Sequence, residues 1–106
     1  MSSYFSALGL ALVLEIPVVA LCFPGQRLRL AITCAVATTV THFFMHFGLA
    51  PLVSSLAQFV VVGELQAVVL EAAAYWLASH PRSLKRALVA SLCANGSSFV
   101  VGLLLF

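Results

Sequence analysis

Residues 4–23 read YFSALGLALVLEIPVVALCF, a run in which Glu15 is the only Asp, Glu, Lys or Arg. A helix that crosses the bilayer needs about 20 predominantly apolar residues, so this run predicts a membrane-spanning helix. Runs of the same kind follow at residues 30–48, 57–78 and 86–106. Helices satisfy their backbone hydrogen bonds internally in lipid, and the runs lack the alternation of barrel strands. We therefore predict an all-α integral membrane protein with four transmembrane helices in a single domain over residues 1–106.

The composition excludes the main classes of water-soluble protein. Of the 106 residues, 63% are hydrophobic and 8% are charged, and the mean hydropathy is +1.16. A soluble domain is about a quarter charged, so this chain could not cover itself in water. Five Lys and Arg residues form no continuous basic patch, which argues against a nucleic-acid partner. The chain has no Asp, no Gly-rich phosphate loop and no Cys-x-x-Cys or His-Glu-x-x-His motif, so we expect no enzyme.

The basic residues predict how the helices are oriented. Arg27 and Arg29 follow the first run, and Arg82, Lys85 and Arg86 follow the third, whereas the linker around residues 48–56 carries no charge. Loops rich in Lys and Arg stay in the cytoplasm. We therefore expect a protein of the bacterial inner membrane, with both basic loops in the cytoplasm and both termini outside.

The two halves of the chain share a polar pattern, which predicts an internal repeat of residues 8–48 and 64–105. The first half contains Leu14-Glu15, Pro24, Arg29, Ala37-Thr38 and Thr41, and the second contains Leu70-Glu71, Pro81, Arg86, Ala94-Asn95 and Ser98. Each half reads as a helical hairpin. Because each unit has two spans, the sequence predicts two tandem hairpins of the same orientation, related by an axis along the membrane normal.

Four polar residues are expected at similar depth near the middle of the bilayer. A rise of about 1.5 Å per residue places Glu15, Thr38, Glu71 and Asn95 at that level. Ionisable groups inside a membrane are rare and usually functional, and burial in lipid favours the protonated form of a carboxyl group. The candidate ion or proton pathway comprises Glu15, Glu71, Glu64, Thr38, Asn95 and Ser98.

A second polar group is predicted nearer the outside. Thr38, His42 and His46 follow at intervals of four on the second helix, and Glu64 lies near the depth of His42 on the third. Two imidazoles and a carboxylate suit zinc or another divalent metal ion, the one cofactor that the sequence suggests. The same residues also fit a proton or hydrogen-bond relay, or ordinary helix packing.

Small residues form a stripe on the fourth helix. Ala90, Ala94, Ser98 and Gly102 recur every four residues, a pattern that lets another helix approach closely. That helix belongs either to the same chain or to another one. Because four helices leave little room for a wide pathway, we expect a homo-oligomer or a subunit of a membrane complex in the lipid bilayer.

Two functions remain open from the sequence. The first is a small transporter or channel-like module that moves a proton or divalent cation along the Glu/His path. The second is a non-catalytic structural or assembly subunit of a larger membrane complex. A transporter needs carboxyl groups that water can reach, whereas an assembly subunit would hold them hydrogen-bonded in a dry helix interface.

Overall fold

The computed structural model describes residues 2–105, and all the regular structure in this part of the chain is helical. Four helices are long and apolar enough to cross a membrane, which confirms the all-α expectation with its four candidate spans. The helices are α1 (Ser2–Cys22), α2 (Arg27–Phe43), α3 (Leu56–Ala78) and α4 (Leu84–Leu105). A π-helical segment, η1 (Phe44–Leu49), and a 3-10 turn, η2 (Ala50–Leu52), extend α2.

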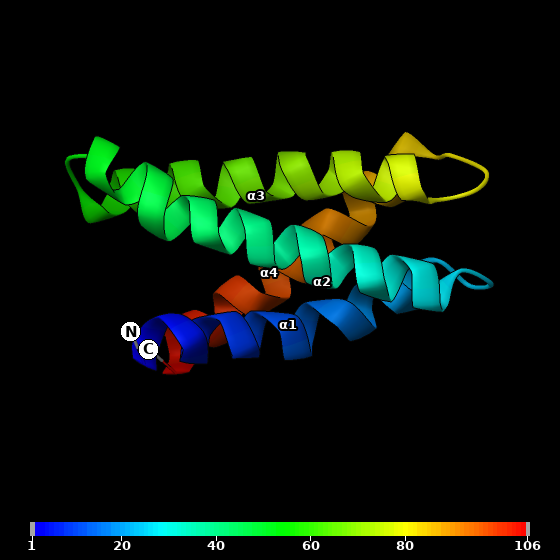
Figure 1. The fold of residues 1–106 in the computed structure, drawn as a ribbon, viewed down its shortest axis with the longest axis horizontal. Coiled ribbons are helices and arrows are strands. Elements are labelled where there is room, and N and C mark those ends of the chain that lie inside the picture. The colour runs from blue at the N-terminus through cyan, green and yellow to red at the C-terminus, as the bar shows by residue number, and fades with distance from the viewer. Residues whose placement is uncertain (1, 106) are drawn as a thin grey trace.

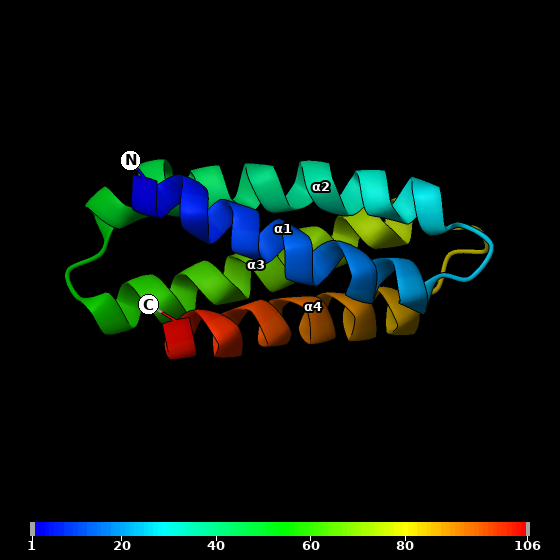
Figure 2. The same ribbon diagram turned by 90° about the horizontal axis from the view of Figure 1, so that it is seen from below.

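The helices run antiparallel in an elongated bundle (Figures 1 and 2). Each of α1 and α3 packs against both α2 and α4, so α1 and α3 lie diagonally across the bundle. The α1–α2 and α3–α4 turns lie at one end, and both chain ends lie at the other (Figure 1). The bundle is 41 Å long, close to the roughly 40–45 Å thickness of a bilayer with its headgroups.

The distribution of side chains is that of a protein surrounded by lipid. Large apolar side chains are exposed on every helix, among them Val13, Val36, Val69 and Leu104. Seven polar or acidic residues are instead buried: Glu15, Thr38, Thr41, Glu71, Ser79, Ser91 and Asn95. In water such an apolar surface would drive association, whereas lipid solvates it.

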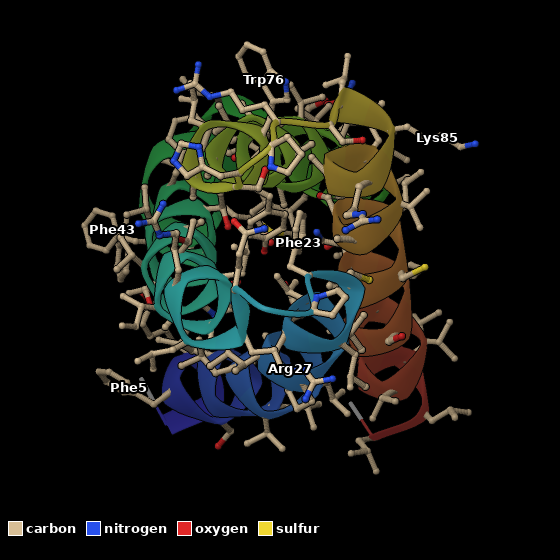
Figure 3. All side chains as sticks on the ribbon, turned by 90° about the vertical axis from the view of Figure 1, so that its right-hand side faces the viewer. Phe5, Phe23, Arg27, Phe43, Trp76 and Lys85 are labelled. Atoms are coloured by element: carbon tan, nitrogen blue, oxygen red, sulfur yellow. The ribbon has the colours of Figure 1, made fainter. Side chains whose placement is uncertain are left out.

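An apolar core fills the bundle near the two turns. Val19, Phe23, Leu30 and Tyr75 are fully buried there, together with alanines of α4. Figure 3, viewed from the turn end, shows Phe23 in the middle of the bundle, whereas Lys85 extends away from it. This core closes the inside of the bundle at the turn end.

The second helix differs most from its predicted bounds of 30–48. It begins earlier, at Arg27, and continues through η1 and η2 to Leu52. Proline fits the first turn of a helix, where its missing N–H removes no internal bond, so Pro51 is accommodated in η2. Residue 1 and the last residue of the predicted span 86–106 lie outside the described residues.

Two glycines offer a test of how closely η1 packs on α3. A Cβ atom at Gly63 would lie 2.5 Å from Met45 Cε and 2.8 Å from Met45 Sδ, whereas one at Gly96 would meet no atom within 4 Å. We expect Gly63→Ala to lower the free energy of unfolding by up to about 1 kcal/mol relative to Gly96→Ala, because the flexible end of the Met45 side chain must move. Thermal unfolding in detergent measures the difference. Equal stability of the two variants would contradict any cost of moving Met45.

Candidate functional site

Two glutamates are buried inside the bundle, one on each of the diagonally opposed helices α1 and α3. Glu15 of α1 is 2% exposed and Glu71 of α3 is 1% exposed. A carboxyl group buried in an apolar bundle costs free energy unless hydrogen bonds compensate the lost hydration. The residues around both glutamates supply those bonds.

Glu15 accepts hydrogen bonds from two different helices. Ser98 Oγ on α4 donates to Glu15 Oε2 over 2.8 Å, and Thr38 Oγ1 on α2 donates to Glu15 Oε1 over 3.2 Å. Thr38 Oγ1 also lies 3.5 Å from Glu71 Oε1. A hydroxyl group has a single proton, so Thr38 can donate fully to only one glutamate at a time.

Glu71 has more donors than Glu15. Tyr75 OH donates to Glu71 Oε1 over 3.1 Å, and Asn95 Nδ2 donates to the same oxygen over 3.3 Å. Thr41 Oγ1 donates to Glu71 Oε2 over 3.0 Å. Both carboxyl oxygens are therefore satisfied, by side chains from α2, α3 and α4.

Helix spacing explains how these side chains meet. Thr38 and Thr41 are three residues apart on α2, as are Asn95 and Ser98 on α4, so each pair lies on one helix face. Tyr75 is one turn from Glu71 on the same face of α3. We call these seven residues the carboxyl layer: Glu15, Thr38, Thr41, Glu71, Tyr75, Asn95 and Ser98.

The carboxyl layer is anchored to its own helices as well. Asn95 Nδ2 also donates to the Ser91 carbonyl oxygen over 2.9 Å, and Ser91 Oγ donates to the Val68 carbonyl oxygen on α3 over 2.8 Å. Cys34 Sγ lies 3.7 Å from Thr38 Oγ1. These bonds hold the donors in place around the glutamates.

Comparison of the chain with protein-family models, curated proteins and solved structures finds no match. A functional assignment therefore depends on the geometry of the chain itself.

The structure brings together five of the six residues of the candidate pathway. Glu15, Glu71, Thr38, Asn95 and Ser98 are joined by hydrogen bonds. Thr41 and Tyr75 were not among the candidate residues. The sequence signal for them is helical spacing. Thr41 shares a face of α2 with Thr38, and Tyr75 shares a face of α3 with Glu71.

Glu64 lies apart from this layer, in a groove between α3 and α4. The groove has a volume of about 360 Å³, and its wall includes Glu64, Asn95, Leu92 and Phe99. Glu64 is partly exposed. Within the described residues, hydrogen bonds donated to carboxyl groups all end on Glu15 or Glu71.

The two histidines lie in an aromatic cluster with Tyr4. The ring centroids of His42 and His46 are 4.5 Å apart, and the Tyr4 ring lies 4.8 Å from His42 and 5.2 Å from His46. His42 Nε2 lies 3.3 Å from the Tyr4 carbonyl oxygen. Phe59 of α3 contacts His46 at a centroid distance of 5.7 Å.

The histidines and Glu64 do not converge as the sequence suggested. Among residues 2–105, no three His, Cys, Asp or Glu side chains are grouped so that they could hold a metal ion. His42 and His46 pack with Tyr4 of α1, whereas Glu64 lines the groove between α3 and α4. Position along the helices predicted a similar depth for these residues, but it did not place them on one face of the bundle.

The small-residue stripe of α4 faces the inside of this chain for most of its length. Ala90 and Ala94 are fully buried in the apolar core, and Ser98 reaches Glu15 of α1. At Gly102 a Cβ atom would meet no atom of the described residues within 4 Å. Close packing along the stripe therefore involves its first three residues.

Proposed function

We propose that the chain is a small membrane transporter or channel-like module that carries protons through the carboxyl layer. The observation that carries this proposal is the position of Thr38 Oγ1, within 3.2 Å of Glu15 and 3.5 Å of Glu71. Two carboxyl groups that share such surroundings in a low dielectric should not both ionise. One of them holds a proton that can be exchanged.

The two carboxyl groups differ in their donors. Glu71 accepts from Tyr75, Asn95 and Thr41. Glu15 accepts from Ser98 and shares Thr38 with Glu71. Among residues 2–105, no group of three His, Cys, Asp or Glu side chains could hold a metal ion, which supports a proton rather than a divalent cation as the transported species.

The internal repeat is part of the same proposal. Thr38 donates to Glu15 within the first half, and Asn95 donates to Glu71 within the second. Across the halves, Ser98 donates to Glu15 and Thr41 donates to Glu71. If residues 8–48 and 64–105 are equivalent hairpins, these four bonds form two equivalent pairs. This pairing supports a pseudo-two-fold axis that passes between the glutamates along the membrane normal.

Glu64 is the proposed approach to the layer from the end that carries the chain termini. Glu64 and Asn95 line the same groove, and Asn95 donates to Glu71 Oε1. In this proposal a proton passes from Glu64 to the layer along the groove. His42 and His46 form a second polar group, beside α1.

Towards the turn end, the core around Phe23 must open transiently for a proton to leave.

One observation also favours a second candidate function. Glu15 and Glu71 are almost fully buried, and the side chains of this chain satisfy their oxygens. Such a layer could serve only to fix the packing of the four helices in a non-catalytic subunit of a membrane complex or homo-oligomer. The two functions differ in whether the layer exchanges protons with water.

Proton flux into lipid vesicles tests the proposed function. Purified protein is reconstituted into vesicles that contain a pH-sensitive dye, and valinomycin with potassium holds the membrane potential at zero. We expect an imposed pH gradient to decay faster than in empty vesicles. A decay equal to that of empty vesicles would favour the structural subunit.

We further propose that the turn end faces the cytoplasm of a bacterial cell. The five Lys and Arg residues all flank the two turns, and such residues remain on the cytoplasmic side. Single cysteines at positions 54 and 83, in a chain without Cys22, Cys34 and Cys93, report the orientation. We expect an impermeant maleimide to label Ser54→Cys in intact spheroplasts and Ser83→Cys only after lysis. The reverse pattern would contradict this topology.

A further inference from the structure

The turn end of the bundle carries a concentrated positive charge. Its basic residues are Arg27, Arg29, Arg82, Lys85 and Arg86. The three acidic residues of the chain, Glu15, Glu64 and Glu71, all lie within α1 and α3 and not at the turns. No carboxylate is therefore placed to neutralise this end, which lies where membrane-spanning helices reach the lipid headgroups.

Hydrogen bonds hold the two turns together. Gln26 Nε2 donates to the His80 carbonyl oxygen over 2.7 Å, and the His80 backbone N–H donates to Gln26 Oε1 over 2.6 Å. Arg29 Nη1 donates to the Ala78 carbonyl oxygen over 3.4 Å. The basic side chains are thus presented on a fixed frame and not on two independent loops.

Two cavities open at this end, and each contains a pair of basic side chains beside an apolar one. The first, of about 360 Å³, is lined by Gly25, Gln26, Arg27, Leu28, Arg29 and His80. The second, of about 420 Å³, is lined by Cys22, Ser83, Lys85, Arg86 and Val89. Leu28 and Val89 are exposed beside these basic pairs. Figure 3 shows Arg27 and Lys85 well apart from each other at this end.

We propose that each of these two cavities binds the headgroup phosphate of an anionic phospholipid. Arginine and lysine are the side chains that bind phosphate oxygens, arginine often through two parallel bonds. Basic residues that flank a membrane-spanning helix attract anionic lipids. Leu28 and Val89 supply the apolar contact that an acyl chain needs and that a free phosphate ion does not use. The ligand is therefore a lipid and not a soluble anion.

Arg82 provides a matched control at the same end. Its guanidinium carbon lies 5.3 Å from the centroid of the Trp76 ring, and it lines neither cavity. Replacing Arg82 by glutamine removes one positive charge from the turn end, as the test variants do. It leaves both basic pairs intact.

Native mass spectrometry of the protein in a non-ionic detergent tests this proposal. Phosphatidylglycerol and phosphatidylcholine with the same acyl chains are added separately, and bound lipids are counted. We expect two tightly retained phosphatidylglycerol molecules and weaker retention of phosphatidylcholine. Arg27→Gln and Lys85→Gln should each weaken one of the two sites roughly fivefold, because each basic residue contributes a comparable share of the attraction. Arg82→Gln should retain both lipids.

Three results would overturn the proposal. Equal retention of the two lipids would show that charge is not recognised. Displacement of phosphatidylglycerol by inorganic phosphate at the same concentration would show a site for a soluble anion. A loss in Arg82→Gln as large as that in Arg27→Gln would show general attraction to the turn end without defined sites. The far-UV circular dichroism of each variant confirms that it remains folded, and Arg27→Lys and Lys85→Arg should restore binding.

Discussion

Replacing Glu71 by alanine is expected to lower the free energy of unfolding by about 1–3 kcal/mol, the largest effect of any single truncation in the carboxyl layer. Glu71 accepts from Tyr75, Asn95 and Thr41, and Thr38 lies within reach of the same carboxyl group. Removing the carboxyl group leaves Tyr75 OH without its acceptor, whereas Asn95 and Thr41 keep backbone carbonyl acceptors on their own helices. A buried donor that loses its partner costs more than the hydrogen bond itself contributes.

Glu64→Ala is the matched control for this variant. Glu64 lies on the same helix and within the same candidate span, but it is partly exposed in the groove and outside the hydrogen-bonded layer. We expect its replacement to change the stability by less than about 0.5 kcal/mol. Denaturant unfolding in detergent, followed by circular dichroism, measures both variants. Equal losses in Glu71→Ala and Glu64→Ala would contradict the role assigned to the layer.

The polar part of the site could be predicted because the spans are otherwise apolar. A polar side chain in lipid must find a partner, so Glu15, Thr38, Glu71 and Asn95 at one depth were expected to meet. The hydrogen bonds of the described residues join these four. Position along a helix gives depth directly, because the rise per residue is constant.

Position around the bundle could not be predicted in the same way. Helices that are apolar on all sides carry no stripe to indicate which face is inside, and lipid accepts any apolar face. Glu64 and His42 were predicted at a similar depth, but Glu64 lines the groove between α3 and α4, whereas His42 packs on Tyr4 of α1. The π-helical geometry of η1, which contains His46, also departs from the interval of four on which the predicted stripe depended.

The packing of α4 shows the same limit. In the structure Ala90 and Ala94 belong to the apolar core, and Ser98 donates to Glu15. The pattern continues to Gly102, where a Cβ atom would meet no atom of the described residues within 4 Å. Sequence spacing identifies a helix face, but the angle between two helices decides how far along that face they touch.

The central claim is that the carboxyl layer exchanges protons, and it predicts a large effect of removing either carboxyl group. Glu15→Gln and Glu71→Gln keep the size of the side chain and one oxygen acceptor, but neither glutamine can release a proton at neutral pH. The matched control is Thr39→Val. Thr39 is exposed on α2, and its hydroxyl donates to the Ala35 carbonyl oxygen of its own helix.

The decisive measurement compares proton flux for these proteins in vesicles, at equal protein content and with the fold of each variant verified by circular dichroism. We expect Thr39→Val to match the unmodified chain, and each glutamine variant to lower the flux by roughly a hundredfold, the usual scale for losing a proton-transfer group. Flux that remains unchanged in both Glu15→Gln and Glu71→Gln would contradict the claim and leave the carboxyl layer with a structural role alone.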